Sequence, residues 1–267
     1  MNNIRTYGNE SFIAAVIHGG PGARGELKPL AEELSRTGGI LEPLQSEKSI
    51  PGEIEELHAL LDPFNKSPLV LIGHSWGAWL SMLYAGRYPA NVRRLILVGC
   101  PPLEIRDLPT AMETRINRLN ASERKSLYRL IEAVHSSQGA DTNAAFAELG
   151  AYVSMVDAFD PIPGSIDRSA IDCRADIYSA IWNEAEELRT SGELLRLAGS
   201  IRCPVTAVHG AYDPHSADGV QKPLERLLKN FQFILLKECG HEPWIERNAR
   251  ETFFQILHQL LSKPDSI

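Results

Sequence analysis

The sequence lacks the cysteine and histidine spacings that mark disulfide frameworks and metal sites. It has four cysteines, and none are paired as CxxC, which favours reduced thiols over a disulfide framework or a zinc site: Cys100, Cys173, Cys203 and Cys239. Its eight histidines form no HxH or HxxxH pair, and we interpret neither GARG nor GAYD as a phosphate-binding loop. We therefore expect neither a bound metal ion nor a diffusible cofactor.

Long hydrophobic runs and basic clusters are also missing. No apolar stretch approaches membrane-spanning length, and the opening MNNIRTYGNE lacks the pattern of a secretory signal. Lys and Arg number 27 against 34 for Asp and Glu, and the net charge of −7 disfavours binding to nucleic acid or to an anionic membrane. We expect a cytoplasmic protein whose partner is a small-molecule or short-peptide substrate. The oligomeric state stays open.

What the sequence does contain is a regular succession of short apolar runs. A chain of 267 residues, 43% hydrophobic, is long enough for one sizeable domain with an insertion. Helical patterns separate most of the runs, and continuous apolar runs are typical of parallel strands covered on both faces. We predict an α/β fold with a doubly wound, mostly parallel sheet, whose ligands bind at the carboxyl ends of the strands. The predicted strands cover residues 12–19, 40–44, 68–74, 93–99, 204–210 and 231–238.

The succession is interrupted over residues 101–200, where amphipathic helical patterns occur without a convincing strand. Unstructured connections of this length are uncommon in compact domains, so we predict an inserted α-helical cap. Residues 1–100 and 201–267 would then form the core. Within the cap, Asn120 is expected to cap a helix together with Glu123, three residues further on.

The sequence GHSWG, Gly73 to Gly77, lies between a predicted strand and a predicted helix. In this context G-x-S-x-G forms a sharp turn that exposes the serine, and the glycines let strand and helix approach each other. Asp213 in GAYDPH and His241 in CGHEPW follow in the chain order nucleophile, acid, histidine, each after an apolar run. We predict Ser75 as nucleophile, His241 as base and acid, and Asp213 as the orienting carboxylate.

These assignments have structural alternatives. A serine in this pattern can be an ordinary turn residue, and Asp213 could merely cap the next helix, with Asp218 near enough to replace it as the acid. His209 and His215 compete with His241, although neither follows the last apolar run.

The glycine-rich sequence HGGPG, His18 to Gly22, follows the first predicted strand. Acyl transfer develops negative charge on a carbonyl oxygen, and fixed backbone N–H groups stabilise that charge. We predict an oxyanion hole made by the N–H groups of Gly20 and Trp76, with Trp76 directly after the nucleophile. His18 is expected to brace the loop by hydrogen bonding rather than to act as a base.

At these residues the chain resembles the α/β-hydrolase superfamily. HGGPG, GHSWG, GAYD and the late CGH match its pattern on both sides of the predicted cap, and HGGPG with SWG is most similar to the proline iminopeptidase-like branch. Two features depart from that branch: His74 stands where it usually has glycine, and EPLQSEKSIPG stands where it usually has a DQRG motif. Because the superfamily usually has two earlier strands, the resemblance also implies an N-terminally trimmed sheet with MNNIRTYG at most a remnant.

In iminopeptidases, acidic cap residues hold the free amine of the substrate, so the resemblance singles out the acidic helix around Trp182. Its candidate substrate-binding residues are Trp182, Glu184 and Glu187. Acidic residues at helical spacing more commonly form a solvated face, and Trp182 can equally pack the cap against the core.

Together these features predict a serine hydrolase that cleaves a small-molecule ester or amide through an acyl-enzyme. A proline iminopeptidase-like aminopeptidase is one alternative, and it requires a cap carboxylate that binds an amine. A non-catalytic ligand receptor is a second alternative, because a fold alone does not fix a function.

Overall fold

The computed structural model describes residues 3–64, 66–104, 110–136, 140–165, 168 and 171–262. The strands are β1 (Ile4–Tyr7), β2 (Phe12–Ile17), β3 (Ala23–Arg24), β4 (Gly39–Pro43), β5 (Leu69–His74), β6 (Val92–Val98), β7 (Asp172–Cys173), β8 (Val205–Gly210) and β9 (Phe231–Leu236). The α-helices are α1 (Lys28–Leu34), α2 (Ile50–Leu61), α3 (Trp76–Arg87), α4 (Ala111–Arg118), α5 (Ala121–Ser136), α6 (Ala140–Asp157), α7 (Ala175–Thr190), α8 (Glu193–Ala198), α9 (Asp218–Leu227) and α10 (Arg250–Ser262).

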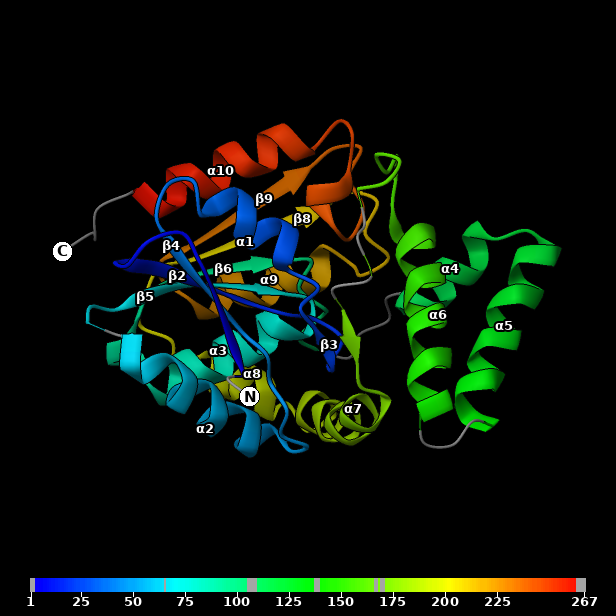
Figure 1. Cartoon of the computed structure of the whole chain (residues 1–267), viewed down its shortest axis with the longest axis horizontal. Coiled ribbons are helices and arrows are strands. Elements are labelled where there is room, and N and C mark those ends of the chain that lie inside the picture. The colour runs from blue at the N-terminus through cyan, green and yellow to red at the C-terminus, as the bar shows by residue number, and fades with distance from the viewer. Residues whose placement is uncertain are drawn as a thin grey trace.

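A seven-stranded sheet in the order β1-β4-β2-β5-β6-β8-β9 forms the centre of the molecule (Figure 1). Only the edge pair β1–β4 is antiparallel, and every other neighbouring pair is parallel. The predicted α/β fold with a mostly parallel sheet is confirmed, and each of the six predicted strands is present.

The prediction that the segment before residue 12 is at most a remnant needs correction. Ile4 to Tyr7 form a strand of the sheet, paired from Ile4 with Pro43 to Tyr7 with Ile40. The mixed burial of this strand explains why it gave no continuous apolar run. A second correction concerns residues 101–200, where β7 pairs with β3 in a separate two-stranded sheet.

Two hydrophobic cores sandwich the sheet, because alternate strand residues face opposite sides. Ala14 and Val16 of β2 pack with α1 and α10, whereas Ala15 and Ile17 pack on the side of α2 and α3. Figure 1 shows α1 and α10 on one face and α2, α3 and α8 on the other. Burial on both faces accounts for the apolar strand sequences.

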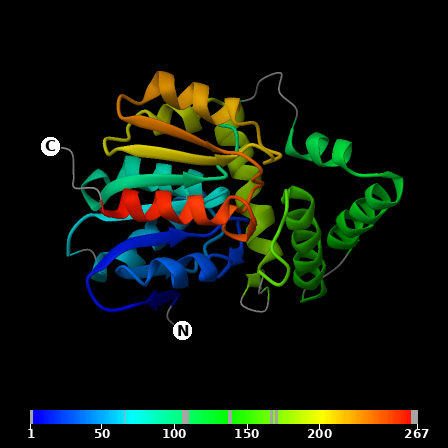
Figure 2. The ribbon, with the colours of Figure 1, turned by 90° about the horizontal axis from the view of Figure 1, so that it is seen from above.

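Helices α4, α5 and α6 lie beyond the carboxyl edge of the sheet, as Figures 1 and 2 both show. Helix α5 begins as predicted, because Asn120 Oδ1 accepts from the N–H of Glu123 and the Glu123 carboxylate accepts from the N–H of Asn120. By contrast, Ile181 of α7 and Leu194 of α8 are buried in the same core as α3. The cap boundaries at residues 101 and 200 stay a prediction.

Candidate active site

Ser75 forms the turn between β5 and α3, at the carboxyl edge of the sheet. Its backbone has φ 52° and ψ −118°, a positive φ that is uncommon for a residue with a side chain. The Ser75 N–H donates to the carbonyl of Val98 at 2.9 Å, which anchors the turn to β6. Strained conformations of this kind persist where the surrounding structure enforces them, and they concentrate at functional sites.

The two glycines of GHSWG are required by close backbone contacts. A Cβ on Gly73 would lie 2.2 Å from the carbonyl oxygen of Gly77, and a Cβ on Gly77 would lie 2.1 Å from that of Ile17. Any side chain at either position would push α3 away from the sheet. The elbow therefore depends on glycine at both positions.

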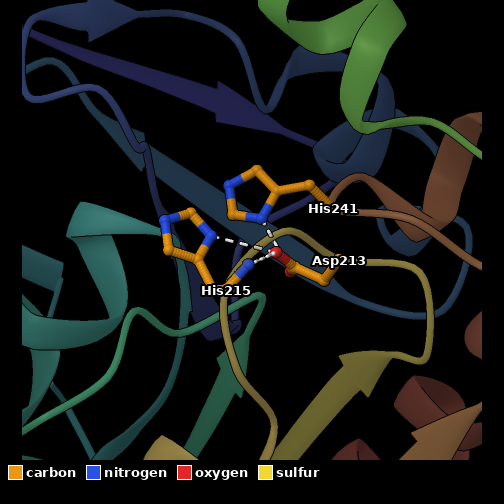
Figure 3. Close-up of side chains that lie close together, drawn as sticks. All are labelled: Asp213, His215 and His241. Atoms are coloured by element: carbon orange, nitrogen blue, oxygen red, sulfur yellow. Dashed lines mark hydrogen bonds and ion pairs between the residues drawn. The ribbon is translucent and has the colours of Figure 1, made fainter. Parts of the chain in front are cut away.

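Asp213 and His241 meet at the carboxyl ends of β8 and β9. His241 Nδ1 lies 2.8 Å from Asp213 Oδ2, and the Asp213 side chain is fully buried (Figure 3). Burial opposes ionisation of Asp213, but His241, His209 and His215 together hold its pKa well below the ordinary value. Burial likewise disfavours a charged His241, but Asp213 outweighs it and raises the pKa of His241 to about 9. The pair thus has the contact expected of a base and its orienting carboxylate.

The imidazole of His241 lies beside the serine turn. Its ring centroid is 4.6 Å from that of His74, the residue before Ser75. A Cβ on Gly99 would lie 2.9 Å from His241 Nδ1, and the preceding residue, Val98, binds the N–H of Ser75. The three residues predicted as catalytic are therefore gathered at one end of the sheet. Among the described residues, the Ser75 hydroxyl makes no hydrogen bond.

The rival acid lies elsewhere. Asp218 is exposed on α9 and pairs with Lys222 at 2.6 Å. The rival histidines instead surround Asp213: His215 Nδ1 lies 2.9 Å from Oδ1, and His209 Nε2 lies 3.8 Å from Oδ2. The choice of Asp213 over Asp218 as the acid stays a prediction, and His209 and His215 are part of the surroundings of the Asp213 carboxylate.

The candidate oxyanion hole lies between HGGPG and the start of α3. The N–H of Trp76 belongs to the first turn of α3, where backbone donors have no partner within the helix. Gly20 has φ 108°, and the neighbouring N–H of Gly19 is already donated to Glu26 at 2.9 Å. His18 Nδ1 contacts the carbonyl of Gly19 at 2.9 Å, so His18 does brace the loop.

Glu26 and His74 form an interaction that sequence reasoning missed. Glu26 Oε1 lies 2.5 Å from His74 Nδ1 and also accepts the N–H of Gly19, while His74 Nε2 contacts the carbonyl of His241 at 3.2 Å. Both ring nitrogens of His74 therefore face oxygen atoms. Burial opposes ionisation of Glu26, but His74 holds its pKa below the ordinary value. One carboxylate thus connects the oxyanion loop, the elbow and the His241 loop.

The three cap candidates have structural contacts of their own. Trp182 stacks on Trp79 of α3 with centroids 6.3 Å apart, so it packs α7 against α3. Glu184 Oε2 accepts the N–H of Ile50 at 2.7 Å, at the start of α2. Glu187 is exposed. Their predicted role in substrate binding stays untested, and Glu184 is engaged by the core rather than free for an amine.

Helices α4 and α6 are fastened to the loop that carries His241. Arg115 of α4 makes a bidentate ion pair with Asp157 of α6, at 2.8 and 2.7 Å, and the carbonyl of Asp157 accepts the N–H of His241. The buried carboxylate of Glu246 accepts the N–H groups of Gly240 and Phe159. Because Asp157 binds both Arg115 and the backbone of His241, the position of His241 depends on the position of α4 and α6.

Asp213, His215 and His241 also form a cluster whose potential metal ligand atoms lie within 4.8 Å of one another. Because the three residues lack a typical ligand spacing, no sequence pattern predicted this cluster. Each imidazole contacts Asp213 through its Nδ1, so both carboxylate oxygens already have a partner.

Within the described parts of the chain, no helix is both long and apolar enough to span a bilayer.

Known proteins share sequence and fold with this chain. The family model described as the alpha/beta hydrolase fold matches residues 52–247. Monoacylglycerol lipase ABHD6 of Homo sapiens is 25% identical over 219 residues, covering 80% of this chain and 61% of the human protein. The Bos taurus protein of the same name is 24% identical over 204 residues, covering 74% of this chain and 57% of its own length. The chain thus spans about three fifths of these curated relatives.

Solved structures show the same fold at low sequence identity. A thermophilic esterase from Thermogutta terrifontis has a TM-score of 0.65 at 18% identity, covering 98% of this chain and 93% of the esterase. An epoxide hydrolase from Bacillus megaterium has a TM-score of 0.66 at 16% identity, covering 97% and 96%. The proline iminopeptidase-like branch is not confirmed. The profile match over most of the chain, on the fold described above, shows that this protein belongs to the alpha/beta hydrolase family of enzymes.

Proposed function

We propose that the protein is a serine carboxylic-ester hydrolase that acts on a small-molecule ester. One observation carries the proposal: the buried Asp213–His241 pair, 2.8 Å apart, lies beside a strained serine turn at the carboxyl edge of the sheet. Open α/β sheets bind ligands at this edge. The monoacylglycerol lipase names of the curated relatives support an ester as the substrate.

In the proposed reaction, Ser75 Oγ attacks the ester carbonyl while His241 Nε2 takes its proton. The N–H groups of Trp76 and Gly20 stabilise the oxyanion, and His241 then gives the proton to the departing alcohol. Water attacks the acyl-enzyme with His241 again as base, which releases the carboxylic acid and restores Ser75. In free enzymes the serine–histidine bond often tightens only with substrate, so the free hydroxyl of Ser75 is compatible with this role.

The cap supports an ester more than an N-terminal amine. An aminopeptidase requires a carboxylate facing the site, and the acidic residues of α7 have other surroundings. Glu184 binds Ile50, Glu186 binds Arg189, and Glu187 is exposed. No observation favours the peptidase as a second candidate function.

The test compares wild type with Ser75→Ala on p-nitrophenyl butyrate and on proline p-nitroanilide, together with labelling by a fluorophosphonate. We expect wild type to cleave the ester and to be labelled, and Ser75→Ala to do neither while remaining folded. Asp213→Asn should lose roughly 10³-fold or more in kcat, whereas Asp218→Asn, an exposed neighbour, should retain activity. Efficient cleavage of the anilide would favour the peptidase, and folded wild type without labelling would favour a receptor.

A further inference from the structure

His215 binds the same carboxylate as His241, one imidazole on each oxygen. His215 Nδ1 lies 2.9 Å from Asp213 Oδ1, and His241 Nδ1 lies 2.8 Å from Asp213 Oδ2. The two ring centroids are 4.8 Å apart, with an angle of 40° between the planes. Asp213 is therefore shared by two histidines rather than reserved for the base.

Hydrogen bonds hold the backbone of His215 as well as its ring. Its backbone N–H also donates to Asp213 Oδ1, at 2.9 Å, and its carbonyl oxygen is 2.9 Å from Nε2 of the buried His209. Two hydrogen bonds to the backbone of His215 and one to its ring leave the imidazole little freedom to turn. The orientation of the ring is thus imposed by the protein.

This orientation determines which ring nitrogen is available to a ligand. Burial lowers the pKa of His215 to about 4, so the ring is neutral at pH 7 and carries one N–H. Asp213 is ionised and only accepts, so the proton lies on Nδ1 and leaves Nε2 as a bare acceptor. Figure 3 shows that the second nitrogens of both rings point away from Asp213, and the His215 side chain is 13% exposed.

We propose that His215 is a further residue of the reaction site, whose Nε2 accepts a hydrogen bond from an O–H group held next to His241. The proposal rests on the proposed ester hydrolysis and deepens it. Two O–H groups could donate this hydrogen bond to His215 Nε2. One belongs to the water that attacks the acyl-enzyme, and the other is a second hydroxyl on the alcohol part of the ester. An ester of a polyol would supply the latter.

The test uses His215→Asn and His215→Phe beside wild type. The amide of asparagine can reach Asp213 from the place of Nδ1 but has no atom at the place of Nε2, whereas phenylalanine loses both contacts. In both variants the backbone N–H of residue 215 still binds Asp213. His135→Asn, an exposed histidine on α5, is the matched control.

Two substrates separate the two donors. If the ligand is a substrate hydroxyl, His215→Asn should lower kcat/KM for 2-hydroxyethyl butyrate about tenfold and leave ethyl butyrate unchanged, since a tenfold change matches the loss of a single hydrogen bond. If the ligand is water, turnover of both esters should fall together, and p-nitrophenyl acetate should show a pre-steady-state burst that wild type lacks. Either pattern supports the proposal.

The proposal is overturned if His215→Asn matches wild type on both esters and in the burst, while His215→Phe alone loses activity. That pattern would mean that His215 only positions Asp213. This outcome is distinct from failure of the proposed function, in which wild type itself cleaves no ester and takes up no fluorophosphonate. In that case both proposals fail.

Discussion

Single residues in this site are defined by the partners that fold around them. Ser75 is held at a positive φ by its bond to β6, and His241 is held by Asp213 on its ring and by Asp157 on its backbone. Glu26 differs because its carboxylate contacts one backbone N–H, that of Gly19, and the ring of His74 at once. Because acyl transfer is sensitive to small displacements, residues of this connecting kind should affect rate more than binding.

Glu26→Gln should therefore lower kcat about tenfold or more with little change in KM. Both contacts use the same carboxylate oxygen, Oε1, so the amide oxygen of glutamine can keep them, but without a charge it holds the His74 ring and the N–H of Gly19 more weakly. Steady-state kinetics on p-nitrophenyl butyrate measures the effect. Glu32→Gln is the control, at an exposed residue of α1 that pairs with Lys28 at 3.8 Å. An unchanged kcat would show that the connection is not needed for catalysis.

The pKa of His241 predicts the pH dependence of activity. The base must be neutral to accept the Ser75 proton, and Asp213 raises its pKa from 6.5 to about 9. The neutral fraction, and with it kcat/KM, should therefore rise with pH between 7 and 9 rather than level off near 7. Initial rates in buffers of constant ionic strength measure this limb. A plateau reached by pH 7 would contradict the dominance of Asp213.

Helices and strands show which features the sequence could predict. The inner strands β4, β5, β6 and β8 are almost wholly buried, and β9 at the edge is only partly buried, yet continuous apolar runs identified all six predicted strands. Strand β1 has mixed burial, and the pairing of β3 with β7 joins segments about 150 residues apart, so neither leaves a local pattern.

Some residues of the candidate site could likewise be predicted from the sequence, and others could not. Ser75, Asp213 and His241 follow strands in a recognisable order, and spacing therefore predicted them. His74 and Glu26 lie 48 residues apart, so only the folded chain brings them together. His215 stood two residues from Asp213 in the sequence, yet its bond to the same carboxylate depends on the turn between them.

At the scale of elements, Glu184 links α7 to α2. Ser49 Oγ accepts the N–H of Gly52, and Glu184 accepts that of Ile50, so two donors at the start of α2 are satisfied. Glu184→Ala should lower the free energy of unfolding by about 1 kcal/mol without changing kcat. Urea unfolding measures it, with the exposed Glu187→Ala as control. Loss of activity on an amine substrate, with stability unchanged, would instead indicate amine binding.

At the scale of the whole molecule, the stability of the fold depends on a buried carboxyl group, that of Glu53, which contacts the residue after Ser75. Glu53 of α2 is fully buried and accepts Trp76 Nε1–H at 2.9 Å through Oε2, while Oε1 has no hydrogen-bond partner among the residues that the structure describes. Burial raises its pKa from 4.5 to about 8. Between these values the folded chain keeps a proton that the unfolded chain releases, so raising the pH through this range lowers the free energy of unfolding.

Glu53→Gln should remove this dependence, because an amide does not ionise and its oxygen can still accept the Trp76 N–H. Relative to wild type, the variant should be more stable at pH 9 by on the order of 2–4 kcal/mol and should gain much less at pH 5. Other titrating groups are common to both chains and cancel in the difference. Urea unfolding at the two pH values gives the comparison, with Glu55→Gln, 58% exposed on the same helix, as control. An equal difference at both pH values would mean that Glu53 ionises at its ordinary pKa.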